Sequence, residues 1–440
     1  METQKQQGNI AAIIICILLF GMISFVTGLA NPMGVIVKSQ FEANNFMSQL
    51  GTFANFLAYA FMGIPAGNIL NKYGYKKTAL VAVAVGFIGV FVQFLSGVAS
   101  SFAIYLTGAF IAGFSMCMLN TVVNPLLNTL GGGGNRGNQF IQIGGTFNSL
   151  MATTVPVLVG LLMGDAARAT IKDANPALFI AMGIFAAAFL ILATSKIPEP
   201  ILALRKEKEA KGIIDEKISY AALFKFRHYV LGIIAIFAYI GIELGVPNII
   251  NLYLTDATTN DLGVAKGLGM DAAAAGTIAG TYWFLMMIGR FIGAAVAGKV
   301  SSRAMLTTVA GLGLIFVLVG ILAPQTTLVK MPVFNSDISF GMTQVPINVM
   351  FLIFVGLCTS VMWGVIFNLA VEGIGKYIAI GSGVFMVMVV GGGIFPAIQG
   401  ALADITNYMF SYWVLVVLLA YILYYALVGY KNVNKDIKVD

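Results

Sequence analysis

The chain has 440 residues, of which 59% are hydrophobic and only 10% are charged, whereas roughly 25% of the residues of a soluble domain are charged. This composition excludes a large soluble domain and indicates an integral membrane protein. The net charge of +7 is better explained by membrane topology than by a nucleic-acid partner, because the basic residues gather in particular loops.

Twelve apolar segments, each of about 20 residues or more, are long enough to cross a bilayer as helices. The sequence therefore predicts an all-α membrane protein with twelve transmembrane helices. In chain order the predicted spans cover residues 9–37, 44–71, 76–98, 102–130, 138–164, 175–196, 226–254, 271–298, 303–323, 346–373, 377–403 and 407–430. The first span is too long to be the core of a cleavable signal peptide.

The distribution of basic residues predicts the orientation of these spans. With the N-terminus inside the cell, nineteen lysines and arginines fall on the cytosolic side. Five fall on the outer side, namely Lys38, Arg168, Lys172, Lys266 and Lys330. Cytosolic loops carry the excess of positive charge in membrane proteins, so we expect both termini in the cytosol.

A charged stretch at residues 199–217 separates two halves of the chain. It holds five basic and five acidic residues and falls between the sixth and seventh predicted spans. We therefore predict an N-terminal six-helix bundle at 1–198, a cytosolic linker at 199–224 and a C-terminal six-helix bundle at 225–440.

An internal repeat indicates that the two halves are pseudo-symmetric. Residues 67–72 and 298–303 each contain a glycine, three further residues, a small polar residue and a cation. Paired six-helix halves are typical of secondary transporters. We expect the loops at these positions to contact the opposite half on the cytosolic side. The predicted gating residues are Asn71, Lys72, Lys76, Lys77 and Arg303.

Amide side chains recur on single faces of several predicted spans. Asn120, Asn124 and Asn128 follow one another at four-residue intervals in the fourth span, which places them on one stripe of a helix. Such amides either bond helices together or line a water-filled cavity. Because they offer donors and acceptors without a cluster of cations, they favour a neutral polyhydroxylated ligand such as a sugar. The candidate substrate-binding residues are Asn31, Asn120, Asn124, Gln142, Asn148, Asn248, Asn251, Trp363 and Asn368.

The tryptophan and the asparagines among these residues also have a simpler structural interpretation. Trp363 offers a flat apolar face for a pyranose ring, but a tryptophan at this depth is equally typical of a helical core. Any single asparagine is equally typical of helix packing. The repetition of amides on several spans is what favours a binding cavity.

Two charged residues lie inside predicted spans. Glu243 lies well within the seventh span and has no cation near it in sequence, so we expect it to take up a proton or to coordinate a cation. The candidate coupling ions are therefore H+ and Na+. Arg290 lies in the eighth span, where we expect it to reach toward the membrane surface or to cap backbone carbonyls.

Signals for other classes of protein are absent from the sequence. The glycines at 131–134 predict a tight turn, but without a following Gly-Lys-Ser/Thr they do not make a phosphate-binding loop. The single histidine, His228, and the scattered Cys16, Cys117 and Cys358 form no metal-ligand or nucleophile pattern. We therefore expect neither an enzyme nor a metal or cofactor site.

Several strings of residues resemble a known family. They are Gly67-x-x-x-Asn71-Lys72-x-Gly74-x-Lys76-Lys77, Asn124-Pro125, Thr146-Phe147-Asn148-Ser149-Leu150, Tyr239-x-Gly241-x-Glu243, Gly289-Arg290-Phe291-x-Gly293, Gly381-Ser382-Gly383 and Gly391-Gly392-Gly393-Ile394-Phe395-Pro396. The chain resembles the major facilitator superfamily and, within it, the fucose, galactose and glucose permeases of bacteria. The resemblance implies a twelve-helix sugar importer of the bacterial inner (plasma) membrane that works by alternating access.

The chain also departs from this pattern. Asn71 stands where an aspartate is usual in the family loop. The proton-linked fucose permease has carboxylates in its first and fourth spans, where this chain has Asn31 and Asn120. Proton coupling therefore cannot be transferred unchanged from that relative.

The leading hypothesis is a monomeric, cation-coupled importer of a hexose or deoxyhexose such as glucose, galactose or fucose, with a sugar and the lipid bilayer as its partners. The nearest alternative is a passive uniporter or a sodium-coupled symporter of the same sugars. A polyspecific exporter would need a large apolar cavity, which the amide stripes disfavour, and a receptor without transport activity is a further alternative.

Overall fold

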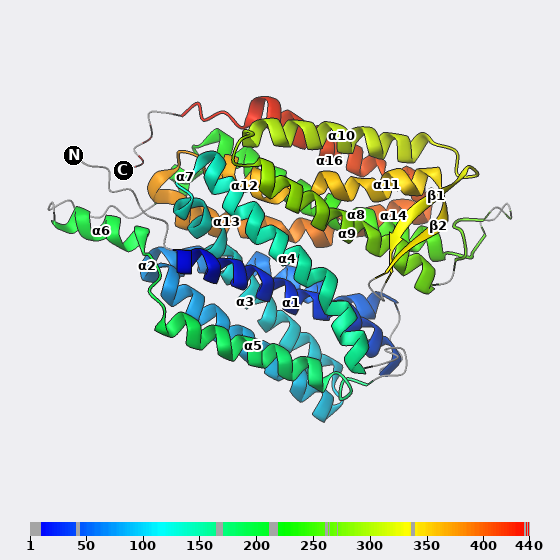
Figure 1. Ribbon diagram of the computed structural model, residues 1–440, viewed down its shortest axis with the longest axis horizontal. Coiled ribbons are helices and arrows are strands. Elements are labelled where there is room, and N and C mark those ends of the chain that lie inside the picture. The colour runs from blue at the N-terminus through cyan, green and yellow to red at the C-terminus, as the bar shows by residue number, and fades with distance from the viewer. Residues whose placement is uncertain are drawn as a thin grey trace.

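The structure is a computed structural model in which residues 10–40, 45–163, 170–210, 219–259, 263, 265–270, 272–335, 339–434, 437 and 439 are described. Nearly all of the described chain is helical (Figure 1). The elements are α1 (Ile10–Gln40), α2 (Asn45–Ala99), α3 (Phe102–Leu130), α4 (Gly134–Met163), α5 (Asn175–Thr194), α6 (Pro200–Ala210), α7 (Tyr220–Leu223), α8 (Arg227–Thr255), α9 (Ala272–Val296), α10 (Ser302–Leu322), β1 (Leu328–Phe334), β2 (Phe340–Pro346), α11 (Ile347–Thr359), α12 (Met362–Val371), η1 (Gly375–Tyr377), α13 (Ile378–Val387), η2 (Met388–Val390), α14 (Gly391–Ile405), α15 (Tyr408–Ser411), α16 (Trp413–Tyr424) and η3 (Tyr425–Gly429).

The helices are long and apolar enough to cross a membrane. Ten such segments lie in the described part of the chain, and the one within α2, Leu50–Ala99, has 50 residues. At 1.5 Å per residue, this length is about twice what one crossing needs. Gly74 interrupts α2 with non-helical backbone angles, which favours two crossings there. The expected total of twelve spans stays a prediction.

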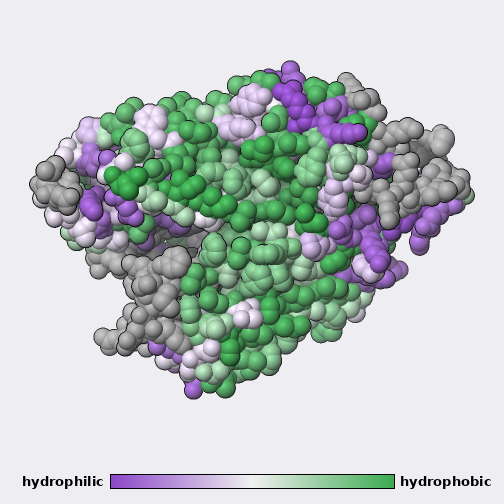
Figure 2. Space-filling view, turned by 180° about the vertical axis from the view of Figure 1, so that it is seen from behind, coloured by the Kyte–Doolittle hydropathy of each residue, from purple (hydrophilic) through white to green (hydrophobic). Residues whose placement is uncertain are grey.

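The helices form two groups that lie against each other. Figure 1 shows α1 to α5 in the lower group and α8 to η3 in the upper group. The helices α6 and α7 lie at one end of the molecule, called the α6 end below, and the hairpin of β1 and β2 lies at the opposite end. Apolar side chains cover the middle of the molecule, while hydrophilic side chains gather toward its two ends (Figure 2). A bilayer therefore has an apolar belt to contact.

Gly74 is held at the break in α2 by a carboxylate. Its φ of 79° is in the left-handed region that favours glycine. Beyond it, the N–H groups of Tyr75 and Lys76 donate to the two carboxylate oxygens of Glu199, each at 2.7 Å. Burial raises the pKa of the Glu199 carboxyl, although these N–H groups and the Lys77 ammonium group favour its charged form. Glu199 thus binds the N-terminus of the second part of α2, where a negative charge is favourable.

Basic side chains bind backbone carbonyls at the C-terminal ends of two neighbouring helical segments. Arg205 of α6 donates to the Asn71 carbonyl at 2.9 Å, just before the break in α2. The Lys76 ammonium group donates to the carbonyls of Ala193 and Ser195 at 2.8 and 2.7 Å, at the end of α5. The predicted linker therefore includes a helix that is bonded to the first group of helices.

The hairpin was not anticipated from the sequence. The strands β1 and β2 pair antiparallel, with Leu328 opposite Pro346 and Phe334 opposite Phe340, between the spans predicted at 303–323 and 346–373. The ring of Phe284 in α9 stacks on Phe334 at 4.4 Å. Three aromatic residues therefore join the hairpin to the second group of helices.

Glycines allow the two groups to approach closely at the α6 end. A Cβ atom on Gly383 of α13 would lie 2.4 Å from the carbonyl oxygen of Gly63 and 2.8 Å from the Cα atom of Gly67, both in α2. Similarly, a Cβ atom on Gly298 would lie 2.7 Å from Oε1 of Gln139 in α4. Backbone therefore packs on backbone where α2 meets α13.

Replacing Gly383 with alanine tests this contact. The added methyl group must displace the α2 backbone, and overpacking of this kind costs roughly 1–3 kcal/mol, so we expect a lower melting temperature in detergent. Gly183→Ala in α5 is the control, because no described atom lies within 4 Å of its Cβ position and alanine is the better helix former. Equal melting temperatures for the two variants would contradict the proposed close contact.

Candidate functional site

An ion pair lies inside the membrane-spanning helices. The Nη2 atom of Arg290 in α9 lies 3.3 Å from Oε1 of Glu243 in α8, and the two side chains are 11% and 13% exposed. A charge in a medium of low dielectric constant is stable only when it is paired or hydrogen-bonded. Glu243 is therefore not the isolated carboxylate that the sequence suggested, and Arg290 does not reach toward the membrane surface.

Arg290 also binds the other group of helices. Its Nη1 atom donates to Oγ of Ser149 at 2.7 Å, to the Gly145 carbonyl at 3.2 Å and to Oδ1 of Asn148 at 3.3 Å. All three acceptors belong to α4. One guanidinium group therefore connects α8, α9 and α4, and its planar set of five donors is suited to this task.

The Nε atom of Arg290 binds the backbone at a break between two helices. Its Nε atom donates to the Ser360 carbonyl at 3.1 Å, between α11 and α12. Arg290 thus caps backbone carbonyls, as the sequence analysis expected. At the same break, Nε2 of Gln142 in α4 donates to the Val361 carbonyl at 2.9 Å. Two side chains thereby bind backbone carbonyls at this break, and the Val361 carbonyl also accepts a bond from the Val365 N–H.

A second set of polar residues lies on α3. Nδ2 of Asn120 donates to the Tyr59 hydroxyl at 3.0 Å, and Nδ2 of Asn124 donates to the Asn120 carbonyl at 2.8 Å. Asn124 in turn accepts a hydrogen bond of 3.0 Å from Nε1 of Trp363 in α12. The ring of Trp363 lies 6.4 Å from that of Tyr239 and 6.0 Å from that of Phe385. The asparagine stripe thus ends at an aromatic cluster of the second group.

Tyr239 connects this cluster to the ion pair. It lies one helical turn before Glu243 on α8 and is completely buried. Its buried hydroxyl group interacts with the side chains of both Glu243 and Arg290. Tyr239 therefore places the aromatic cluster in direct contact with the ion pair.

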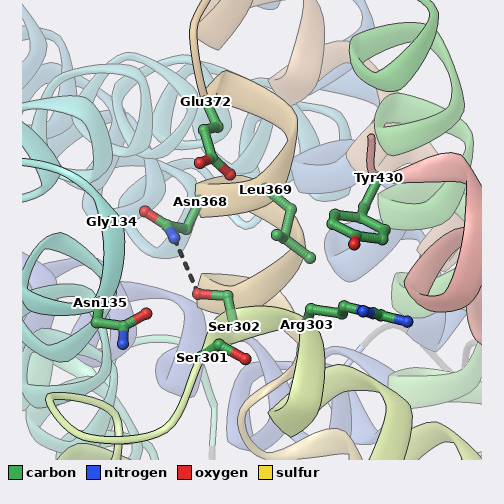
Figure 3. A pocket seen from close by; sticks show the side chains of 9 residues that line it. All are labelled: Gly134, Asn135, Ser301, Ser302, Arg303, Asn368, Leu369, Glu372 and Tyr430. Atoms are coloured by element: carbon green, nitrogen blue, oxygen red, sulfur yellow. Dashed lines mark hydrogen bonds between the residues drawn. The ribbon is translucent and has the colours of Figure 1, made fainter. Parts of the chain in front are cut away.

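A chain of amides joins the two groups nearer the α6 end. Nδ2 of Asn128 in α3 donates to Oδ1 of Asn368 in α12 at 2.5 Å, and Nδ2 of Asn368 donates to Oγ of Ser302 in α10 at 2.9 Å. Figure 3 shows Asn368 and Ser302 beside a cavity of about 270 Å³, with Asn135 of α4 on one side and Arg303 on the other. The Arg303 guanidinium group lies 5.2 Å from the ring centre of Tyr430.

The structure brings most of the expected amides together. Asn120, Asn124, Gln142 and Asn368 are buried and hydrogen-bonded, and half-buried Asn148 donates to the Phe20 carbonyl of α1 at 2.8 Å. Others are placed differently. Asn248 and Asn251 are exposed on α8. Asn31 belongs to α1, and its side chain lies outside the described part of the structure.

Two of the expected gating residues, Asn71 and Lys76, make contacts outside the second group of helices. The backbone near Asn71 contacts α6, and Lys76 binds the end of α5, so neither contact crosses to the second group. Glycines before each repeated cation do lie against the opposite group. Among the described residues no group of three His, Cys, Asp or Glu side chains is placed to hold a metal ion.

Arg290 and Tyr239 were not among the expected site residues. The signal for Arg290 was present in the sequence, because two opposite charges within spans are expected to pair. Glu243 and Arg290 are 47 residues apart, so their pairing is not evident in the sequence.

The comparisons with known proteins agree with this architecture. The Major Facilitator Superfamily model matches residues 13–395. A glucose/galactose transporter of Brucella abortus biovar 1 (strain 9-941) is 28% identical over 436 residues, which cover 98% of this chain and 97% of the relative. An L-fucose-proton symporter of Escherichia coli (strain K12) is 22% identical over 427 residues, which cover 91% and 89%. A crystal structure of the transporter FucP in the outward conformation matches with a TM-score of 0.74 and 18% identity, covering 94% of this chain and 98% of that one.

A double-mutant cycle measures the ion pair. Removing one partner of a buried pair leaves the other charge unpaired, which costs roughly 3–5 kcal/mol. Glu243→Leu and Arg290→Leu should therefore each lower the free energy of unfolding strongly. The double variant should lose less than the sum, because no charge is left unpaired. Ile234→Leu, on the exposed surface of α8, is the control and should have little effect. Additive losses in denaturation experiments would show that the two residues do not interact.

Proposed function

We propose that this chain, which belongs to the Major Facilitator Superfamily, imports a neutral monosaccharide by secondary active transport. The observation that carries the proposal is the polar centre around Arg290, where α4 meets α8, α9 and α12. Relatives along nearly the whole chain are named for the transport of glucose, galactose and L-fucose. A hexose or deoxyhexose is therefore the proposed substrate.

The chemistry of the centre suits a neutral sugar. Amides at Asn120, Asn124 and Asn148 can both donate to and accept from hydroxyl groups, and the ion pair contributes no net charge. Trp363 and Tyr239 supply aromatic faces beside these amides, on which the apolar face of a pyranose can pack. We propose that the sugar binds between the amides of the first group and the aromatic cluster of the second.

Alternating access is the proposed mechanism. Bonds such as Asn128 to Asn368 and the packing of Gly63 on Gly383 join the two groups toward the α6 end. The positive-inside rule assigns that end to the cytosol, so the site in this conformation would open outward. We propose that residues 1–198 and 225–440 move as two bundles joined by the linker 199–224, with the loops at 67–77 and 298–303 as gates.

A proton is the proposed coupling ion. Proton uptake by Glu243 would remove its attraction for Arg290 and leave the guanidinium charge to its acceptors on α4 and to the sugar. A sodium ion bound at Glu243 would lie beside a guanidinium group, where like charges repel. Asn120 cannot titrate, so the proton site would differ from one based on carboxylates in the first and fourth spans. We further propose a monomer in the bacterial inner membrane.

Replacing Asn148 with leucine tests the substrate site. The change removes a donor and an acceptor beside Arg290 and fills the space with an apolar group, so sugar binding should weaken by more than about 1 kcal/mol. Calorimetric titration of purified protein with glucose, galactose and fucose measures this. Gln325→Leu is the matched control, because Gln325 is an exposed amide beyond the end of α10 and accepts a hydrogen bond from the Tyr253 hydroxyl. Unchanged affinity in the folded Asn148 variant would remove this residue from the site.

Replacing Glu243 with glutamine tests the coupling. Wild-type vesicles should accumulate sugar under a proton gradient, whereas Glu243→Gln should lose accumulation and keep counterflow exchange, because exchange requires no net movement of the coupling ion. Asp404→Asn, at the end of α14, should behave as the wild type. Accumulation driven by sodium alone would identify a sodium symporter. If the wild type only equilibrates sugar under both gradients, the protein is a uniporter.

A further inference from the structure

Glu243 and Arg290 form a charge-neutral unit at the edge of the polar centre. Arg290 contacts Asn148 through Nη1 and Glu243 through Nη2. It therefore lies between a residue predicted to bind the sugar and the Glu243 carboxylate. Both side chains keep a small exposed fraction, although they lie within spanning helices. The hydroxyl of Tyr239, one turn away on the same helix as Glu243, interacts with both groups. A sugar that binds at Asn148 would therefore lie beside the pair.

A guanidinium group in such a place is a strong anion site. It binds a carboxylate through two parallel hydrogen bonds, and the low dielectric constant strengthens the attraction. In this chain, Glu243 supplies a carboxylate oxygen at 3.3 Å from Nη2. The protein's own side chain thus occupies the position at which the carboxylate of a ligand would otherwise bind.

We propose that Glu243 is a specificity residue that makes the transporter reject sugar acids. This inference rests on the proposed sugar transport and adds a determinant of substrate charge. A hexuronate differs from a hexose by a carboxylate at C6. In the wild type with Glu243 deprotonated, that carboxylate meets both a neutralised Arg290 and the like charge of Glu243. Without the charge of Glu243, Arg290 attracts that carboxylate instead. Specificity then comes from repulsion of the wrong ligand as well as from bonds to the right one.

The same reasoning applies in reverse to Arg290. A variant that lacks the guanidinium group leaves Glu243 as an unpaired carboxylate, which attracts an ammonium group. An amino sugar carries such a group, so Arg290 excludes amino sugars as Glu243 excludes sugar acids. Removing both charges restores a neutral centre.

Four proteins test the proposal, namely the wild type, Glu243→Gln, Arg290→Gln and the double variant. Each is titrated calorimetrically in detergent, near neutral pH, with galactose, galacturonate and galactosamine and with glucose, glucuronate and glucosamine. The wild type should prefer the neutral sugars. Glu243→Gln should shift the ratio of hexuronate to hexose affinity upward by about tenfold or more. Arg290→Gln should shift the ratio of amino sugar to hexose affinity likewise, and in the double variant both ratios should lie well below those of the respective single variants.

Melting temperatures show whether each variant is folded. If Glu243→Gln does not fold, the amino-sugar ratio of Arg290→Gln, compared with the double variant, decides the question. A folded Glu243→Gln that keeps the wild-type ratio, or that binds no sugar of any charge, overturns the proposal. The same shift in the double variant as in Glu243→Gln also overturns it, because an unpaired charge would then not be the cause. A wild type that binds neither galactose nor glucose overturns the proposed substrate class itself.

Discussion

The ion pair between Glu243 and Arg290 is the interaction on which the centre of this molecule depends. In the interior of a membrane protein, water is not available to solvate a charge, so both groups must find partners within the protein. Arg290 satisfies its donors with Glu243, with α4 and with the Ser360 carbonyl. The break between α11 and α12 exposes that carbonyl. The pair thus joins α8 and α9 to α4 and to the segment between α11 and α12.

The contacts between the two groups of helices also satisfy buried polar groups within the protein. Within each group, large apolar side chains such as Phe185 and Phe367 are fully buried. Between the groups, single hydrogen bonds such as Asn128 to Asn368 alternate with close glycine contacts such as Gly63 to Gly383. A typical hydrogen bond contributes only about 1 kcal/mol net. Contacts of this kind suit an interface that opens and closes, as the proposed mechanism requires.

The proposed linker binds helix ends through charged side chains and also packs apolar side chains such as Ile201 and Leu223 on the core. Glu199 binds free N–H groups where the second part of α2 begins, and Arg205 binds a carbonyl where the first part ends. Each charge has the sign that the helix dipole favours. The break at Gly74 is therefore joined to the linker, so a movement of the linker would act directly on the loop between the two parts of α2.

The sequence by itself determined the class of fold and the stripes of amides. Lipid forces every backbone polar group to be satisfied within a helix, so apolar length predicted a membrane protein built of helices. Helical periodicity placed Asn120 and Asn124 on one face. Tertiary structure decided which stripe meets which partner. Trp363 reaches Asn124 across 239 residues, and Arg290 reaches Glu243 across 47. It also decided that residues 328–346 form a hairpin against α9. Such pairings depend on how helices pack against each other, which periodicity within one segment does not encode.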